Sequence, residues 1–382
     1  MKKDKIIRTS TVPSSLLILL KGQLQFLSQH YEVVGISSNG VELQQVEERE
    51  GVRTLAVDME RGIHPMKDLI SLLRLYKQFK KEKPDVVHSI TPKAGLLTML
   101  AGKMAGVPIR MHMFTGLIFP TRTGFMQKLL IKMDQLLCWA ATHVYPEGNG
   151  VKNDLINYNI TKKPLKVLAN GNVNGIDLDY FHPQQVALET IENLHATLGI
   201  RPDDFVFIFV GRLVGDKGIN ELVDAFTKNK LPNSKLLLVG PLETDLDPLA
   251  ESTLKEIQHN PHIISVGFQK DVRPYFGLSH ALVFPSYREG FPNVVMQAGA
   301  MELPSIVTNI SGCNEIVQQG INGTIIPAKD SEALAMAMKT MHKDTANYEY
   351  MKSNARSMIL NRFQQQLVWN AVLDEYKHLL KK

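Results

Sequence analysis

One run of residues constrains the fold of this chain more than any other. Residues 205–210, Phe-Val-Phe-Ile-Phe-Val, are apolar at every position. An unbroken apolar strand is typical of a parallel sheet that helices cover on both faces. A helical pattern follows from about Ile219 to Lys228, and the same alternation of strand and helix runs through the chain. We therefore predict an α/β fold with parallel sheets and right-handed crossovers.

The alternation places the expected elements along both halves of the chain. Strands are expected at residues 5–11, 31–36, 85–88, 109–113, 205–210, 235–240, 263–266, 281–284 and 305–308. The first helix is expected to follow a serine cap at Ser14 or Ser15 and to end at about Gln29. Further helices are expected at residues 64–83, 94–105, 125–141, 219–228 and 363–380, and one is expected to begin near Asn293.

The length of 382 residues suits two domains of ordinary size. Glycine and asparagine concentrate at residues 170–175, which marks the expected junction. We predict an N-terminal Rossmann-like domain over 1–172, a second over 173–362, and a last helix over 363–382 that could cross back to the first. In doubly wound folds ligands bind beyond the carboxyl ends of the strands, so we expect an interdomain cleft there.

Composition excludes several classes of protein. Hydrophobic residues make up 44% and charged residues 21%, which argues against disorder. No apolar run approaches 18 residues, and no apolar core follows the basic start, so neither a membrane span nor a secretory signal is expected. Cys138 and Cys313 match neither a disulfide framework nor a zinc site, which favours the reducing cytoplasm.

Charge is distributed unevenly between the two halves. Residues 1–180 carry 24 Lys and Arg against 16 Asp and Glu, a formal charge of +8, so the remainder of a chain of net charge +5 carries −3. A basic half indicates an anionic partner, such as a phosphorylated substrate or a lipid surface. Scattered surface charge is the alternative.

The loop at residues 211–218, Gly-Arg-Leu-Val-Gly-Asp-Lys-Gly, follows the apolar strand directly. Gly211 permits close backbone approach, and Arg212 and Lys217 place two positive charges in one loop. A guanidinium fork and an ammonium group suit a diphosphate. An ordinary surface turn is the alternative.

The segment at residues 286–297 follows the strand expected at 281–284. Pro292 and Asn293 are expected in the first turn and cap of a helix, whose free N–H groups favour an anion. Gln297 lies about one turn further on, so Glu289 and Gln297 could face one bound molecule. A helix cap with a surface glutamate is the alternative.

Together these two segments resemble the retaining glycosyltransferases of family 4, which have the GT-B fold: two Rossmann-like domains facing a cleft. The resemblance extends over the whole chain and is nearest to enzymes of bacterial capsule, O-antigen and related surface-polysaccharide synthesis. Residues 174–177, Asn-Gly-Ile-Asp, look like the interdomain segment of the family, and residues 85–95 resemble its acceptor-side signature.

The resemblance implies a site residue by residue. Catalytic roles fall on Arg212 and Lys217, which would bind the donor diphosphate, and on Glu289, which would hold the sugar hydroxyls. Donor binding is implied for Gly211, Phe268, Gly290, Phe291, Pro292, Asn293, Val294 and Gln297. The acceptor side is implied to include Ser14, His88, Lys93, Thr115 and Gly116.

The chain departs from the family pattern at three places. Position 297 is Gln where the family has a second Glu that binds the ribose, so we expect weaker or altered ribose binding. Thr115 stands where many relatives have His, and His112 lies on the opposite face of its strand. Residues 12–15, Val-Pro-Ser-Ser, form the first strand–helix loop, where relatives often have a Gly-Gly pair.

The resemblance implies transfer with retention of configuration from a nucleotide-diphosphate-sugar, most often a UDP-sugar, to a glycan or lipid-diphosphate-linked sugar. No other cofactor is implied. Two Asp-x-Asp triplets, 177–179 and 245–247, offer a metal motif, but with Arg212 and Lys217 at the phosphates we expect no metal site. Basic residues in helices 64–83 and 125–141 predict peripheral contact with anionic membrane, solvated faces being the alternative.

Two other functions remain open from the sequence, and a third is disfavoured. A GT-B-fold sugar-nucleotide epimerase shares the architecture, and Gln297 and Thr115 would also fit a nucleotide-sugar-binding protein with impaired catalysis. An NAD-dependent oxidoreductase is disfavoured, because Gly148-Asn149-Gly150 lacks the third glycine of the dinucleotide fingerprint.

Overall fold

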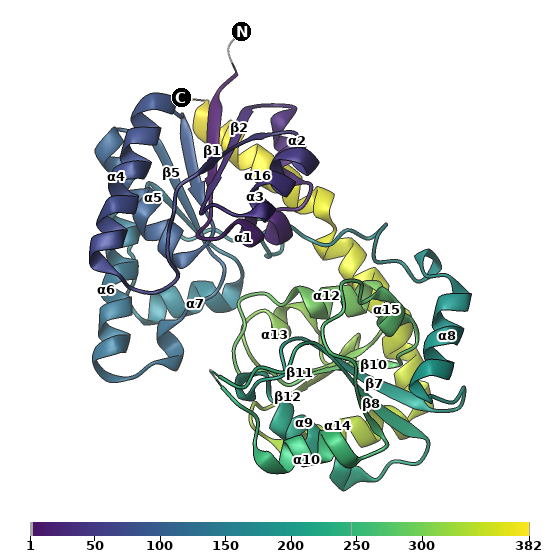
Figure 1. Ribbon diagram of the computed structural model, residues 1–382. Coiled ribbons are helices and arrows are strands. Elements are labelled where there is room, and N and C mark those ends of the chain that lie inside the picture. The colour runs from purple at the N-terminus through teal and green to yellow at the C-terminus, as the bar shows by residue number, and fades with distance from the viewer. Residues whose placement is uncertain (1–2, 246, 382) are drawn as a thin grey trace. The chain divides into compact units, whose positions relative to one another are not determined.

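The computed structural model describes residues 3–245 and 247–381. The chain forms two compact units: the residues up to Gly175 together with those from Gln365 onward, and Ile176–Gln364. Each unit contains a six-stranded sheet in which neighbouring strands run parallel (Figure 1). The predicted class, α/β with two doubly wound units, is confirmed.

The first unit has the strand order β3-β2-β1-β4-β5-β6. From β1, the next strands in the chain are added first on one side and then, from β4 onward, on the other side, as in doubly wound sheets. Its strands are β1 (Lys5–Thr9), β2 (Glu32–Ser37), β3 (Arg53–Ala56), β4 (Val86–Ser89), β5 (Ile109–Phe114) and β6 (His143–Pro146). Its helices are α1 (Pro13–Leu19), α2 (Gln23–Ser28), α3 (Val41–Glu50), α4 (Pro65–Glu82), α5 (Pro92–Ala105), α6 (Gly124–Ala140), α7 (Asn149–Asn157) and α16 (Gln365–Leu380).

Helices α4, α5 and α6 cover one face of this sheet, and α1, α2, α3 and α16 cover the other (Figure 1). The last helix is fixed by a buried polar cluster. The Tyr376 hydroxyl lies 3.2 Å from Nη1 of Arg8 and 2.6 Å from Nδ1 of His88. All three side chains are almost completely buried, so α16 is part of the core of the first unit.

The second unit repeats the topology in the order β12-β11-β10-β7-β8-β9. Its strands are β7 (Phe205–Val210), β8 (Ser234–Val239), β9 (Ile263–Ser265), β10 (Ala281–Phe284), β11 (Ser305–Thr308) and β12 (Gly323–Ile326). Its helices are α8 (Leu188–Leu198), α9 (Ile219–Asn229), α10 (Glu251–His259), α11 (Arg273–Gly277), α12 (Asn293–Ala300), α13 (Cys313–Ile316), α14 (Ser331–Lys343) and α15 (Thr345–Phe363).

Helices α9, α10 and α14 lie on one face of the second sheet, and α12, α13 and α15 lie on the other (Figure 1). This double cover explains the wholly apolar sequence of β7, in which Val206, Phe207, Ile208 and Phe209 have no exposed surface.

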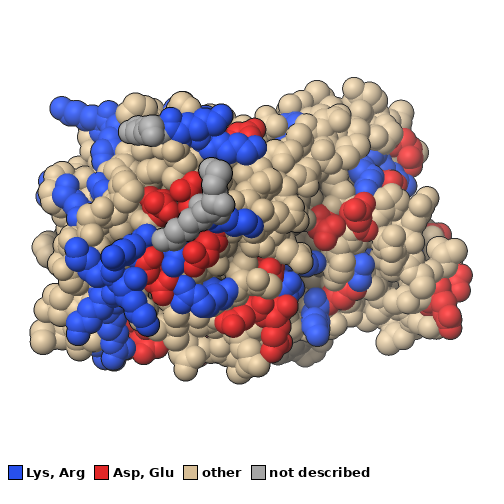
Figure 2. Space-filling model, turned by 90° about the horizontal axis from the view of Figure 1, so that it is seen from above, with Lys and Arg blue, Asp and Glu red and all other residues tan. Residues whose placement is uncertain are grey.

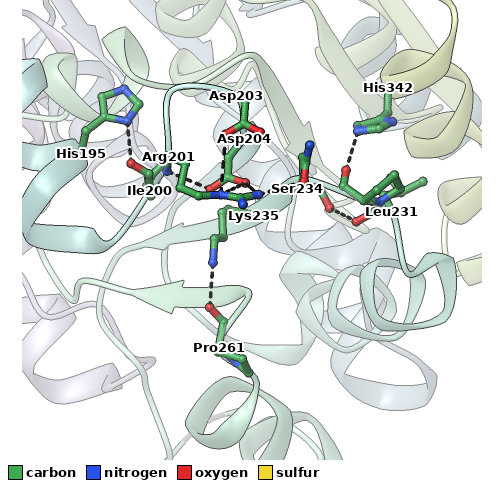
Figure 3. Close-up of polar contacts among 12 residues, drawn as sticks. His195, Ile200, Arg201, Asp203, Asp204, Leu231, Ser234, Lys235, Pro261 and His342 are labelled. Atoms are coloured by element: carbon green, nitrogen blue, oxygen red, sulfur yellow. Dashed lines mark hydrogen bonds and ion pairs between the residues drawn. The ribbon is translucent and has the colours of Figure 1, made fainter.

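Polar contacts within the protein stabilise the amino-terminal edge of the second sheet (Figure 3). Just before β7, Nη2 of Arg201 lies 3.0 Å from Oδ1 of Asp204. On β8, Nζ of Lys235 donates to the carbonyl oxygen of Pro261 at 3.1 Å. These residues connect strand ends, and the predicted donor residues lie at the opposite, carboxyl-terminal edge.

Two predicted helices differ from the observed ones. No serine caps the first helix: Val12 is its N-cap, because Pro13 occupies the first helical position that suits a residue without an N–H. The expected helix to Gln29 is divided into α1 and α2 by Gly22, which has a φ of +79°. The helix expected at 363–380 begins at Gln365, since Gln364 is extended and separates it from α15.

Candidate donor and acceptor sites

The donor residues of the second unit lie in loops that follow neighbouring strands. Arg212 and Lys217 follow β7, and Glu289 and Gly290 follow β10, the strand hydrogen-bonded to β7. Phe268 follows β9, at the far edge, and its side chain is 73% exposed. The carboxyl ends of parallel strands share one edge, so these loops lie along the same side of the sheet.

Lys217 and Glu289 form the centre of this group. The Lys217 ammonium group donates to Oε1 of Glu289, and both side chains are 16% exposed. Ser286, which is fully buried, donates to the same carboxylate oxygen at 2.8 Å. The carboxylate of Glu289 is thus held from two sides.

Two glycines allow these loops to approach closely. Gly218 has a φ of +71°, and a Cβ atom there would lie 2.2 Å from the carbonyl oxygen of Pro285. Gly312 has a φ of +75°, and its Cβ would lie 2.4 Å from the carbonyl oxygen of Gly290. Any side chain at either position would push the loops apart.

Arg212 contacts a different partner from Lys217. Its Nη1 lies 2.8 Å from Oε2 of Glu243, in the loop after β8. The Arg212 side chain is 51% exposed and the Glu243 side chain 35% exposed, so the guanidinium group remains accessible to a ligand. An anion binding there would compete with this carboxylate.

The segment Phe291–Gln297 places the first turn of α12 after Glu289. Pro292 is the N-cap of α12, and Asn293 is the first residue of the helix. Val294 and Gln297 are partly exposed, whereas Phe291 is 6% exposed and packs edge-on against Phe363. The Phe291 side chain therefore belongs to the core, and only its backbone is free for a ligand.

Ser286 and Cys313 belong to this site, and sequence reasoning gave neither of them a role. Ser286 lies just after the carboxyl end of β10, where ligand sites of parallel sheets are expected, and this position is the signal by which the sequence could have identified it. Cys313, the first residue of α13, is fully buried. Burial raises the pKa of its thiol well above the usual value, and the negative charge of Glu289 raises it further, so the thiol stays neutral.

On the first unit, three of the predicted acceptor residues lie close to the ends of β4 and β5. Thr115 Oγ1 donates to the carbonyl oxygen of Ile90 at 2.8 Å, and Gly116 follows it. Lys93, in the first turn of α5, forms an ion pair with Asp68 of α4. Gly116 and Lys93 line the same small pocket.

The other predicted acceptor residues lie elsewhere. Ser14 is in the first turn of α1. His88 is fully buried beneath α16, and burial lowers the pKa of its imidazole well below the usual value. His112, which the sequence placed on the face opposite Thr115, is hydrogen-bonded to Ser89 at 2.7 Å, and burial lowers its pKa to about 3. Both imidazoles are therefore neutral.

The Asp-x-Asp triplets have backbone partners. Asp177 Oδ1 accepts from the N–H of Tyr180 at 2.9 Å, and Asp247 Oδ2 accepts from the N–H of Asp216. Leu246, in the middle of the second triplet, lies outside the described residues. Over 3–245 and 247–381, no three His, Cys, Asp or Glu side chains cluster as ligands of a metal ion.

The fold and the donor loops define a class of protein, a glycosyltransferase of the GT-B type. The group 1 glycosyl transferase family matches residues 190–358, and the glycosyl transferase 4-like domain matches residues 26–171. The chain is 34% identical to the capsular polysaccharide biosynthesis glycosyltransferase CapM of Staphylococcus aureus, over 100% of this chain and 99% of CapM. The chain therefore belongs to this glycosyltransferase family and is a transferase.

Other comparisons agree with this assignment. An Escherichia coli UDP-Gal:α-D-GlcNAc-diphosphoundecaprenol α-1,3-galactosyltransferase is 29% identical over 79% of this chain and 78% of its own. The crystal structure of Anabaena HepE in complex with UDP has a TM-score of 0.81 and 18% identity over 99% of this chain and 100% of its own. That structural likeness shows the fold.

Proposed function

We propose that the protein is a retaining glycosyltransferase of bacterial surface-polysaccharide synthesis that uses a UDP-sugar and acts without a metal ion. The observation that carries this proposal is the contact of Lys217 with Glu289 at the carboxyl ends of β7 and β10. A cation for phosphate and a carboxylate for sugar hydroxyls are thus adjacent in one unit, as a nucleotide-sugar requires.

The donor contacts follow from the chemistry of these groups. Lys217 and Arg212 bind the diphosphate, and the positive end of the α12 helix dipole adds a second source of positive potential. Glu289, positioned by Ser286, accepts hydrogen bonds from the hydroxyls of the donor sugar. Gln297 and Phe268 contact the ribose and the base.

Catalysis then depends on stabilising the leaving group. The bond from the anomeric carbon to the diphosphate breaks, and the acceptor oxygen bonds to the same face of that carbon. The acceptor hydroxyl gives its proton to the departing phosphate. Arg212 and Lys217 stabilise the negative charge that develops there, and enzymes usually gain more rate from such electrostatic stabilisation than from any other single effect. Glu289 orients the sugar and forms no covalent bond with it.

The acceptor is proposed to be a sugar linked through diphosphate to a lipid, bound by the first unit. Support comes from the E. coli relative, whose name gives a diphosphoundecaprenol-linked acceptor, and from CapM, whose name gives capsular polysaccharide biosynthesis. With such an acceptor, the enzyme would work at the cytoplasmic surface of the membrane.

Peripheral membrane contact is the corresponding proposal for location. No helix among the described residues combines the length and the apolar character that a membrane span needs. Figure 2 shows Lys and Arg side chains gathered in clusters, with Asp and Glu side chains between them. Lys77, Lys80 and Lys81 of α4 are exposed and would attract anionic lipid. Flotation with phosphatidylglycerol vesicles at low salt tests this contact, and an unbound protein would contradict it.

A thermal-shift panel of nucleoside diphosphates and nucleotide-sugars tests the donor assignment. A ligand that binds only the folded protein raises the melting temperature by mass action. We expect the largest shift with UDP and UDP-sugars, and radiolabel transfer from the best donor to a lipid-diphosphate sugar in the presence of EDTA. A shift with no uridine nucleotide would contradict the donor, and loss of transfer in EDTA would contradict metal independence.

A further inference from the structure

A small apolar pocket opens in the first unit, beside Gly116 and Lys93. Its volume is about 80 Å³, and its apolar lining includes Leu96 of α5, Phe114 of β5 and Leu130 and Met133 of α6. Sites for whole small molecules usually measure hundreds of Å³. This pocket therefore fits a short aliphatic segment better than a complete sugar.

Exposed apolar side chains follow two of the lining residues, Ile63 and Ile118, along the chain. Ile63, which lines the pocket, is followed along α4 by Met66, Leu69 and Ile70, with exposed fractions between 49% and 73%. Ile118 also lines the pocket and leads to Phe125, which is 80% exposed, and then to Met126. Exposed apolar side chains grouped beside a pocket are typical of an interaction site.

Positive charges lie beside this apolar surface. Arg61 lines the pocket and is exposed, and Arg122 and Lys128 are exposed and lie close to Phe125 in the chain. Lys93 lines the pocket too, but its charge is paired with Asp68. An apolar surface next to exposed cations suits a ligand that has both an aliphatic chain and an anionic group.

Asp134 of α6 completes the lining. It makes no hydrogen bond and no ion pair within residues 3–245 and 247–381, and burial raises the pKa of its carboxyl to about 7. A carboxyl that is uncharged over part of the physiological range is compatible with an apolar neighbour. A carboxylate would lose its hydration beside the aliphatic chain, which is unfavourable, and would repel the diphosphate.

We propose that this surface, from Ile63–Ile70 across the pocket to Ile118–Met126, binds the aliphatic chain of the lipid-diphosphate acceptor, with Arg61 on the diphosphate. The inference rests on the proposed function, which supplies a lipid-linked acceptor. It adds that the protein contacts the first part of the lipid chain as well as the sugar. The part of the lipid nearest the diphosphate occupies the pocket, and the exposed apolar side chains cover the next part of the lipid.

Calorimetry with farnesyl diphosphate and methyl diphosphate tests the proposal without donor or transfer. We expect farnesyl diphosphate to bind at least tenfold more tightly. The variant Met66→Ser/Phe125→Ser changes two exposed side chains and should keep its fold; it should lose most of that difference. Met336→Ser, at a 71% exposed position of α14, is the matched control and should bind as the wild type does. Equal affinity for the two diphosphates, or an unchanged preference in the double variant, would overturn the inference.

Vesicle flotation separates acceptor binding from simple bilayer contact. If the double variant no longer floats with phosphatidylglycerol vesicles but retains the wild-type preference for farnesyl diphosphate, the surface contacts the bilayer and the inference is wrong. A wild type that prefers farnesyl diphosphate but transfers no sugar would contradict the proposed function and leave the lipid site standing.

Discussion

Lys217 and Glu289 are 72 residues apart in the chain, yet the ammonium group of one donates to the carboxylate of the other. They meet because β7 and β10 are neighbours in the sheet, although β8 and β9 separate them in sequence. Each group partly neutralises the other in the free protein. Binding of a diphosphate sugar would satisfy both, the phosphate at Lys217 and the hydroxyls at Glu289.

Replacing Lys217 by Met should weaken UDP binding by about 10- to 150-fold, since hydrogen bonds to charged groups contribute about 1.5–3 kcal/mol. The change also leaves Glu289 without its cation. Calorimetry with UDP measures the loss. Lys228→Met is the control, because Lys228 forms a comparable but exposed pair with Asp224 on α9. An unchanged UDP affinity in Lys217→Met would remove Lys217 from the donor site.

Ser286→Ala should affect the sugar more than the nucleotide. The Ser286 hydroxyl holds Oε1 of Glu289, and its loss frees the carboxylate to rotate. We expect kcat to fall about 5- to 13-fold, corresponding to about 1–1.5 kcal/mol for the loss of one hydrogen bond, with little change in UDP affinity. Ser286→Thr retains a hydroxyl and should recover part of the rate. Equal losses in UDP binding and in kcat would indicate a general disturbance of the loop.

Glu243→Gln should strengthen donor binding. The Glu243 carboxylate lies 2.8 Å from the guanidinium group that we assign to the diphosphate, so it competes with the ligand. Because the pair is largely exposed, its own contribution is small, and we expect UDP to bind about two- to fivefold more tightly. Asp245→Asn, an exposed change in the same loop, is the control for net charge. Weaker binding in Glu243→Gln would mean that Glu243 helps to hold Arg212 in place.

Gln297→Glu tests the departure from the family pattern. An ionised acceptor contributes about 1.5–3 kcal/mol against about 0.5–1.5 kcal/mol for a neutral one. If position 297 contacts the ribose hydroxyls, the carboxylate should tighten UDP binding several-fold, and Gln297→Met should weaken it. Deoxyuridine diphosphate, which lacks one of those hydroxyls, should be less sensitive to the change. Unaltered affinity for UDP in both variants would show that Gln297 does not contact the ribose.

The sequence predicts the strongly patterned parts of this fold well. Strands β7, β10 and β11 begin and end where expected, since each is short, apolar and bounded by turn residues. Strands β3, β6 and β12 are not predicted, and all three lie at sheet edges. The patterns of β3 and β12 are weak because these strands are only partly buried, and β6 is only four residues long. The break at Gln364 is not predicted either, because a single extended residue between two helices leaves the apolar spacing almost unchanged.

Loop residues at strand ends were predictable, but their partners were not. The positions of Lys217 and Glu289 after β7 and β10 follow from the alternation of strand and helix. Their contact depends on the order of the strands in the sheet, which cannot be inferred from the local sequence around either residue. The burial of His88 beneath Tyr376 likewise depends on the return of α16 to the first unit, through a pair 288 residues apart.

Asp134 offers a prediction about stability and pH. The pKa of an aspartate is 3.8 before folding and about 7 in the folded protein, because burial disfavours the charged form. Between these values the folded protein holds a proton that the unfolded chain has released. The free energy of unfolding should therefore decrease as the pH rises from about 4 to about 7, and should not decrease further through this group above about pH 8.

Asp134→Asn removes the titration and keeps the shape of the side chain. We expect this variant to exceed the wild type in unfolding free energy by on the order of 2–4 kcal/mol at about pH 8, and to lose that advantage near pH 4. Urea unfolding at both pH values measures the difference. Asp374→Asn, at a 73% exposed position of α16, should show no such dependence. If Asp134→Asn changed stability equally at both pH values, the pKa of the carboxyl would be the same in the folded and unfolded protein. The carboxyl would then be ionised near neutral pH, and an uncharged Asp134 could no longer support an aliphatic ligand in the pocket.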